Sequence, residues 1–251
     1  MKGKDQDMAL LSYLSSLFFS RHKVPIRCSA VIAAAGSSQR MDGEDKLFVE
    51  ICGMPVLAHT LLAFQRCSEV SEIVVVARED CLKRVGDICK HYGIDKASKV
   101  MKGGATRLES VYKGVFAVSG KSQLIAIHDG ARPCIEGPII KAAIDDAAKH
   151  LAVAPGVPVS STIKKVKDGV VLETVDRESL VEIQTPQVFI AELIKGALTM
   201  ARDESIDVTD DCKAVELLGV PVHIIEGSRT NIKLTTNEDL IVAEAILKCK
   251  K

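Results

Sequence analysis

The sequence predicts a doubly wound α/β fold, with a mostly parallel sheet of Rossmann-like type and a protruding β-hairpin arm. From Ser29 onward, short apolar runs alternate with longer amphipathic stretches, the pattern of parallel strands joined by crossover helices. The first apolar run ends in a row of small residues, as ligand-binding turns of such sheets do. Two polar, β-rich segments later in the chain flank an Asp-Gly turn, which favours a hairpin.

Five short apolar segments are predicted as strands of the sheet, at 30–35, 73–77, 99–102, 124–128 and 152–159. We expect these strands to be apolar on both faces because helices cover both sides of a parallel sheet. The helices between them are expected to begin near Met54, Asp80, Thr106 and Gly137.

The alternation breaks at the predicted hairpin. Segments 162–166 and 170–175 flank Lys167, Asp168 and Gly169, and their polar pattern does not suit a central layer. We therefore predict an arm at about 160–177 that projects from the domain. Helices are expected again from Ile190, Asp210 and Asn237, with strands at 222–226 and 231–234.

The chain is expected to form one domain, because it has no internal repeat, low-complexity tract or Pro/Gly-rich linker. With 251 residues, 47% of them hydrophobic, it can bury a core without disulfides or a metal. We assign residues 28–251 to this domain, arm included, and residues 1–27 to an N-terminal extension. The apolar run at 8–19 is too short to span a bilayer, and we expect it to form an amphipathic surface helix.

Charge and cysteine content exclude several classes of protein. Lys and Arg number 33 and Asp and Glu number 33, so no global positive field favours nucleic acid or an anionic membrane as a partner. The eight cysteines are scattered, without a CxxC pair or zinc-ligand spacing, which predicts no metal-ligand set and reduced thiols in a cytoplasmic protein. A phosphate site must therefore be built locally.

The first predicted strand runs into the segment AAAGSSQRM at 33–41, followed by Lys46. Small residues let backbone N–H groups approach a ligand closely, so this turn suits a phosphate cradle. It matches neither the GxGxxG dinucleotide fingerprint nor the GxxxxGK[ST] phosphate loop. The alternative is a small-residue turn that carries two solvated cations.

Four further segments place turn residues and charges at the ends of elements. GGATRLES at 103–110 joins a strand to a helix, and its glycines free the backbone for contact with a flat base. HDGARP at 128–133 ends the next strand with Asp129, which could hold a hydroxyl or a hydrated magnesium ion. TVDR at 174–177 and QTPQ at 184–187 follow the hairpin.

Together these segments resemble the 2-C-methyl-D-erythritol 4-phosphate cytidylyltransferases of the non-mevalonate isoprenoid pathway. The resemblance spans Ser29 to Lys248 and rests on seven motifs in order: AAAGSSQRM, HDGARP, PVSSTIKKV, ETVDR, QTPQVF, TDDCKAVE and NIKLTT. It implies a nucleotidyltransferase domain with a dimerising β-arm. The implied reaction transfers CMP from CTP to 2-C-methyl-D-erythritol 4-phosphate, giving 4-diphosphocytidyl-2-C-methyl-D-erythritol and pyrophosphate.

The resemblance also implies roles for individual residues. Arg40 and Lys46 would stabilise charge on the CTP phosphates, and Arg177 and Lys233 would aim the acceptor at phosphorus. The triphosphate would be lined by Gly36, Ser37 and Ser38, and cytosine recognised by Gly104, Ala105 and Ser110. The acceptor would also contact Asp129, Arg132, Thr162 and Thr209. The remaining binding residues that it implies are Ala34, Ala35, Gly103, Arg107 and Gly130.

The implied cofactor is Mg²⁺, held mainly by the phosphates of CTP. The implied assembly is a homodimer through the arm, in which Arg40 and Lys46 of one subunit meet Thr162 and Arg177 of the other. The chain departs from the common family pattern at Ser38, at Leu47 and in a shorter loop between Arg40 and Lys46.

Several alternatives stay open at this point. The TVDR and NIKLTT segments also fit a ribitol 5-phosphate cytidylyltransferase of wall polymer synthesis, which has the same fold and chemistry. The scaffold also suits a noncatalytic nucleotide-binding regulator. A Rossmann dehydrogenase is disfavoured because the glycine fingerprint is absent.

Individual residues have structural alternatives too. We interpret His128 as a buried, hydrogen-bonded histidine outside the site. Thr209 is expected as a helix N-cap, and Asp210 and Asp211 as acids that favour a helix start. Arg177 could simply pair with Glu178 or Glu182 on the surface.

Overall fold

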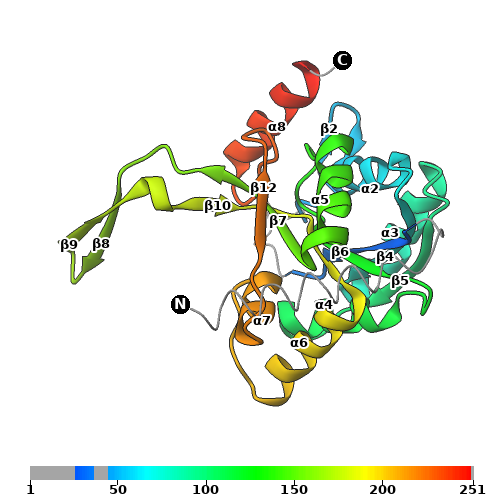
Figure 1. The fold of residues 1–251 in the computed structure, drawn as a ribbon. Coiled ribbons are helices and arrows are strands. Elements are labelled where there is room, and N and C mark those ends of the chain that lie inside the picture. The colour runs from blue at the N-terminus through cyan, green and yellow to red at the C-terminus, as the bar shows by residue number, and fades with distance from the viewer. Residues whose placement is uncertain (1–25, 37–44, 250–251) are drawn as a thin grey trace.

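The structure, a computed structural model, describes residues 26–36 and 45–249. The predicted helix at 8–19 and the site residues Ser37, Ser38 and Arg40 lie outside the described residues. The described chain forms one large sheet between two helical layers, from which a long arm extends (Figure 1).

Four neighbouring strands of the sheet run parallel. In spatial order they are β5 (Ala97–Lys102), β4 (Val70–Ala77), β1 (Cys28–Ala34) and β6 (Leu124–Asp129). The chain builds outward from β1 through β4 to β5 and then returns to place β6 on the other side of β1. This reversal of strand order is the topological switch of a doubly wound sheet, so the predicted fold class is confirmed.

The other half of the sheet mixes strand directions. β11 (Gln187–Ile190) lies antiparallel between β6 and β7 (Ala152–Pro158). β10 (Val181–Ile183) pairs antiparallel and β12 (His223–Glu226) parallel with β7. The two antiparallel strands have only three and four residues, which is too few for a sequence pattern to predict them.

Helices cover both faces of the sheet. On one face pack α2 (Val56–Arg66), α3 (Leu82–His91), α5 (Gly137–His150) and α8 (Asn237–Cys249). On the other face pack α4 (Arg107–Ala117), α6 (Ala191–Asp203) and α7 (Asp211–Leu217). The smaller elements are β2 (Glu50–Ile51), β3 (Met54–Pro55) and two 3₁₀ turns, η1 (Glu79–Cys81) and η2 (Arg177–Ser179).

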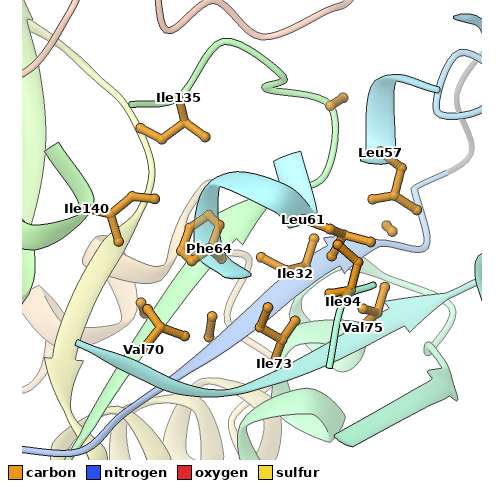
Figure 2. Close-up of a cluster of buried hydrophobic side chains, with 14 of the residues drawn as sticks. Ile32, Leu57, Leu61, Phe64, Val70, Ile73, Val75, Ile94, Ile135 and Ile140 are labelled. Atoms are coloured by element: carbon orange, nitrogen blue, oxygen red, sulfur yellow. The ribbon is translucent and has the colours of Figure 1, made fainter. Parts of the chain in front are cut away.

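The two cores are separated by side-chain alternation along the central strands. In β1, Ile32 points into the core under α2 and Val31 into the core under α4. Figure 2 shows Ile32 among Leu61, Phe64 and Ile73 in the first core. The prediction of strands apolar on both faces holds for β1 and β4. It is wrong for β5, whose residues are all exposed or half-buried because β5 pairs on one side only.

The predicted hairpin is present. β8 (Ile163–Lys167) and β9 (Val170–Val175) pair antiparallel around Asp168 and Gly169, which both have positive φ, as a type I′ turn requires. The two strands are exposed along nearly their whole length and reach away from the rest of the chain (Figure 1). The predicted strand at 231–234 is not formed, and that segment is irregular.

Candidate active site

A cavity of about 440 Å³ opens at the carboxyl edge of the sheet, where the strand order reverses between β1 and β6. This is where ligands bind in open α/β sheets, and the volume suits a small molecule. Ten predicted site residues line it: Ala34, Ala35, Gly36, Lys46, Gly104, Ala105, Arg107, Ser110, Asp129 and Lys233. Ala33, Leu47, Thr106 and Ala131 line it as well and were not predicted.

Close packing explains the two glycines after β5. A Cβ atom at Gly103 would lie 2.6 Å from the Cβ of Ala35, and one at Gly104 would lie 2.2 Å from the Cβ of Glu109. Neither glycine has a positive φ. The lack of a side chain, rather than unusual backbone angles, lets Gly103 lie against the turn after β1 and lets Gly104 lie against Glu109 of α4.

The loop between β5 and α4 is held by its own side chains. The Gly104 N–H donates to Ser110 Oγ at 3.0 Å, and the Ala105 N–H donates to Glu109 Oε2 at 2.7 Å. Thr106 caps α4 by accepting from the Glu109 N–H. This arrangement resembles a capping box, and it fixes the shape of the cavity wall.

Arg107 is fixed by a residue of α7. Its guanidinium makes two hydrogen bonds with Asp211, at 3.0 and 2.7 Å, and the Asp211 side chain is only 1% exposed. Gln187 accepts from the backbone N–H groups of Asp211 and Cys212 and so secures the start of the helix. This role of Asp211 was not predicted, because 104 residues separate the two partners and no spacing signal links them.

Asp129 is surrounded by cations. Arg132 Nε and Lys233 Nζ each lie 3.1 Å from Oδ2, and an Arg107 nitrogen lies 3.9 Å from Oδ1. Burial would raise the pKa of this carboxyl, but the charges of Lys233, Arg132 and Arg107 outweigh it and hold the pKa at about 2. Asp129 is therefore ionised at neutral pH and holds three cationic side chains around the cavity.

The segment after β12 is tied to the loop that carries Asp129, although it forms no strand. The Asn231 carbonyl accepts from Arg132 Nη1 at 2.8 Å, and the Leu234 N–H donates to the Ala131 carbonyl at 2.9 Å. These contacts place Lys233 at the cavity even though its own side chain is 44% exposed.

His128 lies beneath the cavity rather than in it. It is fully buried, and its Nδ1 lies 2.9 Å from Thr185 Oγ1, which in turn accepts from the Asp129 N–H. Burial lowers the pKa of His128 to about 3, so the imidazole is neutral at physiological pH. The interpretation of His128 as a buried, hydrogen-bonded residue outside the site agrees with this placement.

Lys46 enters the cavity from a short turn. Burial and the nearby charge of Lys233 lower the pKa of Lys46, although Asp45, Asp239 and Asp129 act in the opposite direction. Among the residues that the structure describes, no carboxylate lies within 4.0 Å of Lys46 Nζ. Two ammonium groups thus share one cavity, and an anion between them would relieve their repulsion.

Some predicted residues lie away from the cavity wall. Gly130 donates its N–H to the Ala33 carbonyl, and Arg132 acts on Asp129 from behind the wall. Thr162 and Arg177 are exposed on the arm, where Arg177 donates to the Ser160 carbonyl. Thr209 is exposed and is not the N-cap of α7, a prediction that was wrong. Asp210 takes that position, because its side chain accepts from the Lys213 N–H.

The described residues contain no group of three or more His, Cys, Asp or Glu side chains that could together hold a metal ion. Asp129 is the carboxylate among the cavity-lining residues, and its oxygens are hard donors of the kind that Mg²⁺ prefers. No described helix has the length and apolar character needed to cross a membrane.

A largely parallel α/β sheet with a cation-lined cavity at its switch point is suited to binding an anionic ligand such as a nucleotide. Residues 28–249 match the model of the family IspD, 2-C-methyl-D-erythritol 4-phosphate cytidylyltransferase. The chain belongs to this family.

Relatives and solved structures agree with the family match. The 2-C-methyl-D-erythritol 4-phosphate cytidylyltransferase of Halalkalibacterium halodurans is 45% identical over 224 residues, covering 89% of this chain and 98% of the relative. That of Dehalococcoides mccartyi is 41% identical over 223 residues, covering 88% and 96%. The crystal structure of 4-diphosphocytidyl-2C-methyl-D-erythritol synthase from Anaerococcus prevotii aligns with a TM-score of 0.80 at 32% identity, covering 89% of this chain and 97% of that one.

Proposed function

We propose that this chain transfers CMP from CTP to 2-C-methyl-D-erythritol 4-phosphate and releases pyrophosphate, in the synthesis of isoprenoid precursors. The observation that carries the proposal is the set of three cations, Lys46, Arg107 and Lys233, around one cavity at the switch point of the sheet. Membership of the cytidylyltransferase family gives the substrates that such a cavity would serve.

The reaction needs positioning more than acid–base chemistry. A phosphate oxygen of the acceptor attacks the α-phosphorus of CTP, the bond from this phosphorus to the bridging oxygen breaks, and pyrophosphate leaves with the electron pair. The acceptor is already an anion, so no general base is required to activate it. The enzyme must hold two polyanions in line and neutralise the charge that builds on the transferred phosphoryl group.

Lys46 is suited to that neutralisation. Its ammonium shares a partly buried cavity with Lys233 and has no carboxylate partner within ion-pair distance among the described residues. A triphosphate would replace the repulsion between the two ammonium groups by attraction to each. We assign Lys46 to the CTP phosphates, together with Arg40 and the backbone of Gly36 and its neighbours.

The base and the acceptor would occupy opposite ends of the cavity. Gly104, Ala105 and Ser110 line the part of the cavity that would receive the flat pyrimidine, together with Arg107. Asp129 and Lys233 line the part of the cavity that would receive the acceptor, and Arg132 holds Asp129 from behind this wall. Asp129 contributes hydrogen-bond acceptors for hydroxyl groups, while Lys233 can turn from Asp129 toward a phosphate.

We also propose that the active enzyme is a homodimer in which the arm of one subunit completes the cavity of the other. Thr162 and Arg177 lie at the base of the arm and do not line the cavity of their own subunit. The arm exposes apolar side chains at Val166, Val170 and Leu172. Exposed apolar surface of this kind is typical of a protein–protein contact.

The proposed cofactor is Mg²⁺ that arrives with the CTP phosphates, with Asp129 as the cavity carboxylate able to contact it or its waters. When bound, the ion would screen charge on the triphosphate. We propose a cytoplasmic location, which the eight scattered cysteines support because no disulfide bond joins any of them.

A pyrophosphate-release assay tests the proposed reaction. The purified protein is given Mg²⁺, one nucleotide (CTP, UTP or ATP) and one acceptor (2-C-methyl-D-erythritol 4-phosphate or ribitol 5-phosphate). We expect release with CTP and the methylerythritol acceptor, and strong discrimination against ATP because a purine leaves unmatched polar groups in a desolvated pocket. Comparable turnover with ATP, or a preference for ribitol 5-phosphate, would contradict the proposal.

A further inference from the structure

The turn that presents Lys46 is anchored from outside the cavity. Asp45 Oδ1 accepts from the Leu47 N–H at 3.1 Å, and the Asp45 carbonyl accepts from the Phe48 N–H at 2.9 Å. Leu47 and Phe48 are buried, which fixes the C-terminal side of the turn. The orientation of Lys46 therefore depends on how the Asp45 carboxylate is held.

Arg78 holds that carboxylate. It follows the last residue of β4, and its Nη1 lies 2.6 Å from Asp45 Oδ2. The Asp45 side chain is 9% exposed, so this ion pair is shielded from water on one side. Arg78 does not line the cavity, and its other nitrogens bond to Asp80, at 3.1 and 3.3 Å, and to Cys81.

These contacts give Arg78 two sets of partners with different consequences. The bonds to Asp80 and Cys81 belong to the η1 turn and set the direction of the guanidinium. The bond to Asp45 crosses 33 residues of sequence and ties the end of a central strand to the residue before Lys46. It also places a positive charge beside the carboxylate that is the immediate sequence neighbour of Lys46.

We propose that Arg78 is a positioning residue for the transfer reaction, which acts through Asp45 to hold the Lys46 ammonium at the cavity. This inference rests on the proposed function. A displaced ammonium would lose contact with charge that develops in the transition state, and a misplacement of about 1 Å in such a group can cost up to about a hundredfold in rate.

A double-mutant cycle tests the inference. Rates of pyrophosphate release are measured in single turnovers, with enzyme in excess, for the wild type, Arg78→Gln, Lys46→Ala and the double variant. We expect Arg78→Gln to lower the rate by about tenfold in the wild-type background. It should change the rate by less than about twofold in the Lys46→Ala background, because the group through which it acts is gone. A merely structural role would lower both rates by the same factor.

The matched control is Asp80→Asn. It removes the negative charge of the exposed partner of Arg78 and leaves the contact with Asp45, so its rate should stay within about twofold of the wild type. If Arg78→Gln does not fold, as judged by thermal unfolding, Asp45→Asn replaces it, because it breaks the same ion pair and keeps an oxygen for the Leu47 N–H.

The possible outcomes separate the inference from the function on which it rests. A wild type that releases no pyrophosphate with any acceptor contradicts the proposed function. If the wild type is active, two results contradict only the role of Arg78. In the first, Arg78→Gln releases pyrophosphate as fast as Asp80→Asn; in the second, Arg78→Gln lowers the rate by the same factor with and without Lys46.

Discussion

The cavity edge and the arm hold their polar residues in opposite ways. At the cavity, Asp129, Arg107 and Asp211 are fixed by contacts within the chain, and Asp211 is almost fully buried. On the arm, the strands pair only with each other, and Thr162 and Arg177 face solvent. The cavity residues are held by contacts within the chain, whereas the arm leaves its side chains exposed to solvent.

The largest difference between the cavity and the arm is expected in how much a substitution lowers the free energy of unfolding. Arg107→Ala leaves the buried Asp211 carboxylate without its bidentate partner, and removing one member of a buried ion pair costs about 3–5 kcal/mol. Urea denaturation followed by circular dichroism measures the loss. The matched variant on the arm is Lys165→Ala, which removes an exposed pair with Glu173 at 4.0 Å and should change stability little. Equal losses of unfolding free energy in the two variants would contradict this difference between cavity and arm.

The next largest effect is expected on kcat when Lys46 is replaced. Lys46→Ala should lower kcat by about a hundredfold or more, while affinity for CTP changes much less, since the charge it meets develops in the transition state. Steady-state kinetics and calorimetric titration with CTP separate the two quantities. Lys164→Ala on the arm is the control and should retain wild-type kcat. If Lys46→Ala lowered only the affinity for CTP and left kcat unchanged, Lys46 would not be a catalytic residue.

The pH dependence of stability should depend on His128, which lies beneath the cavity. Folded His128 binds a proton only below pH about 3, whereas an unfolded histidine does so below about 6.5. Unfolding therefore takes up a proton between these values, and stability falls as pH drops from about 6.5. At pH 5 the contribution is a loss of about 2 kcal/mol relative to neutral pH.

Denaturation curves between pH 5 and 8 test this sign. His128→Asn should flatten the dependence by that amount, and His91→Gln, a change on the exposed surface, should leave it as in the wild type. An unchanged slope in His128→Asn would show that the imidazole is not held neutral by burial.

The smallest expected effect is a partial recovery of activity when two inactive variants, one in the cavity and one on the arm, are mixed. If each cavity needs the arm of a partner, mixing inactive Lys46→Ala with inactive Arg177→Ala lets mixed dimers form one site with both defects and one with neither. Random exchange makes about half the dimers mixed, so about a quarter of wild-type activity should return. No recovery, with exchange verified by native mass spectrometry, would place both residues in a site within one subunit.

The cavity could largely be predicted from sequence because its residues follow strands directly. Gly36, Gly104 and Asp129 come at or just after the ends of β1, β5 and β6, and parallel strands bring these ends to one edge. Lys233 could not be placed by such reasoning. It lies in an irregular segment, and hydrogen bonds of Asn231 and Leu234 to distant residues bring it to Asp129.

Other features had no readable signal in the sequence. The pairing of Arg107 with Asp211 depends on how α7 packs against α4 and α6, so the acid pair at 210–211 was interpreted as helix-start residues only. That interpretation is confirmed for Asp210 and incomplete for Asp211. The strands β10 and β11 escaped prediction because three or four residues are too few to show a period.

The arm joins the sheet in a way that leaves the register of the sheet independent of the arm. Pro158 and Val181, which pair across β7 and β10, bring the two ends of the arm side by side before it leaves the domain. The sheet register on either side is therefore set without the arm, so a shorter turn in place of residues 164–174 would leave the domain's own strands in register. Within this architecture, the length and surface chemistry of the arm can change while the cavity at the carboxyl edge of the sheet keeps its shape.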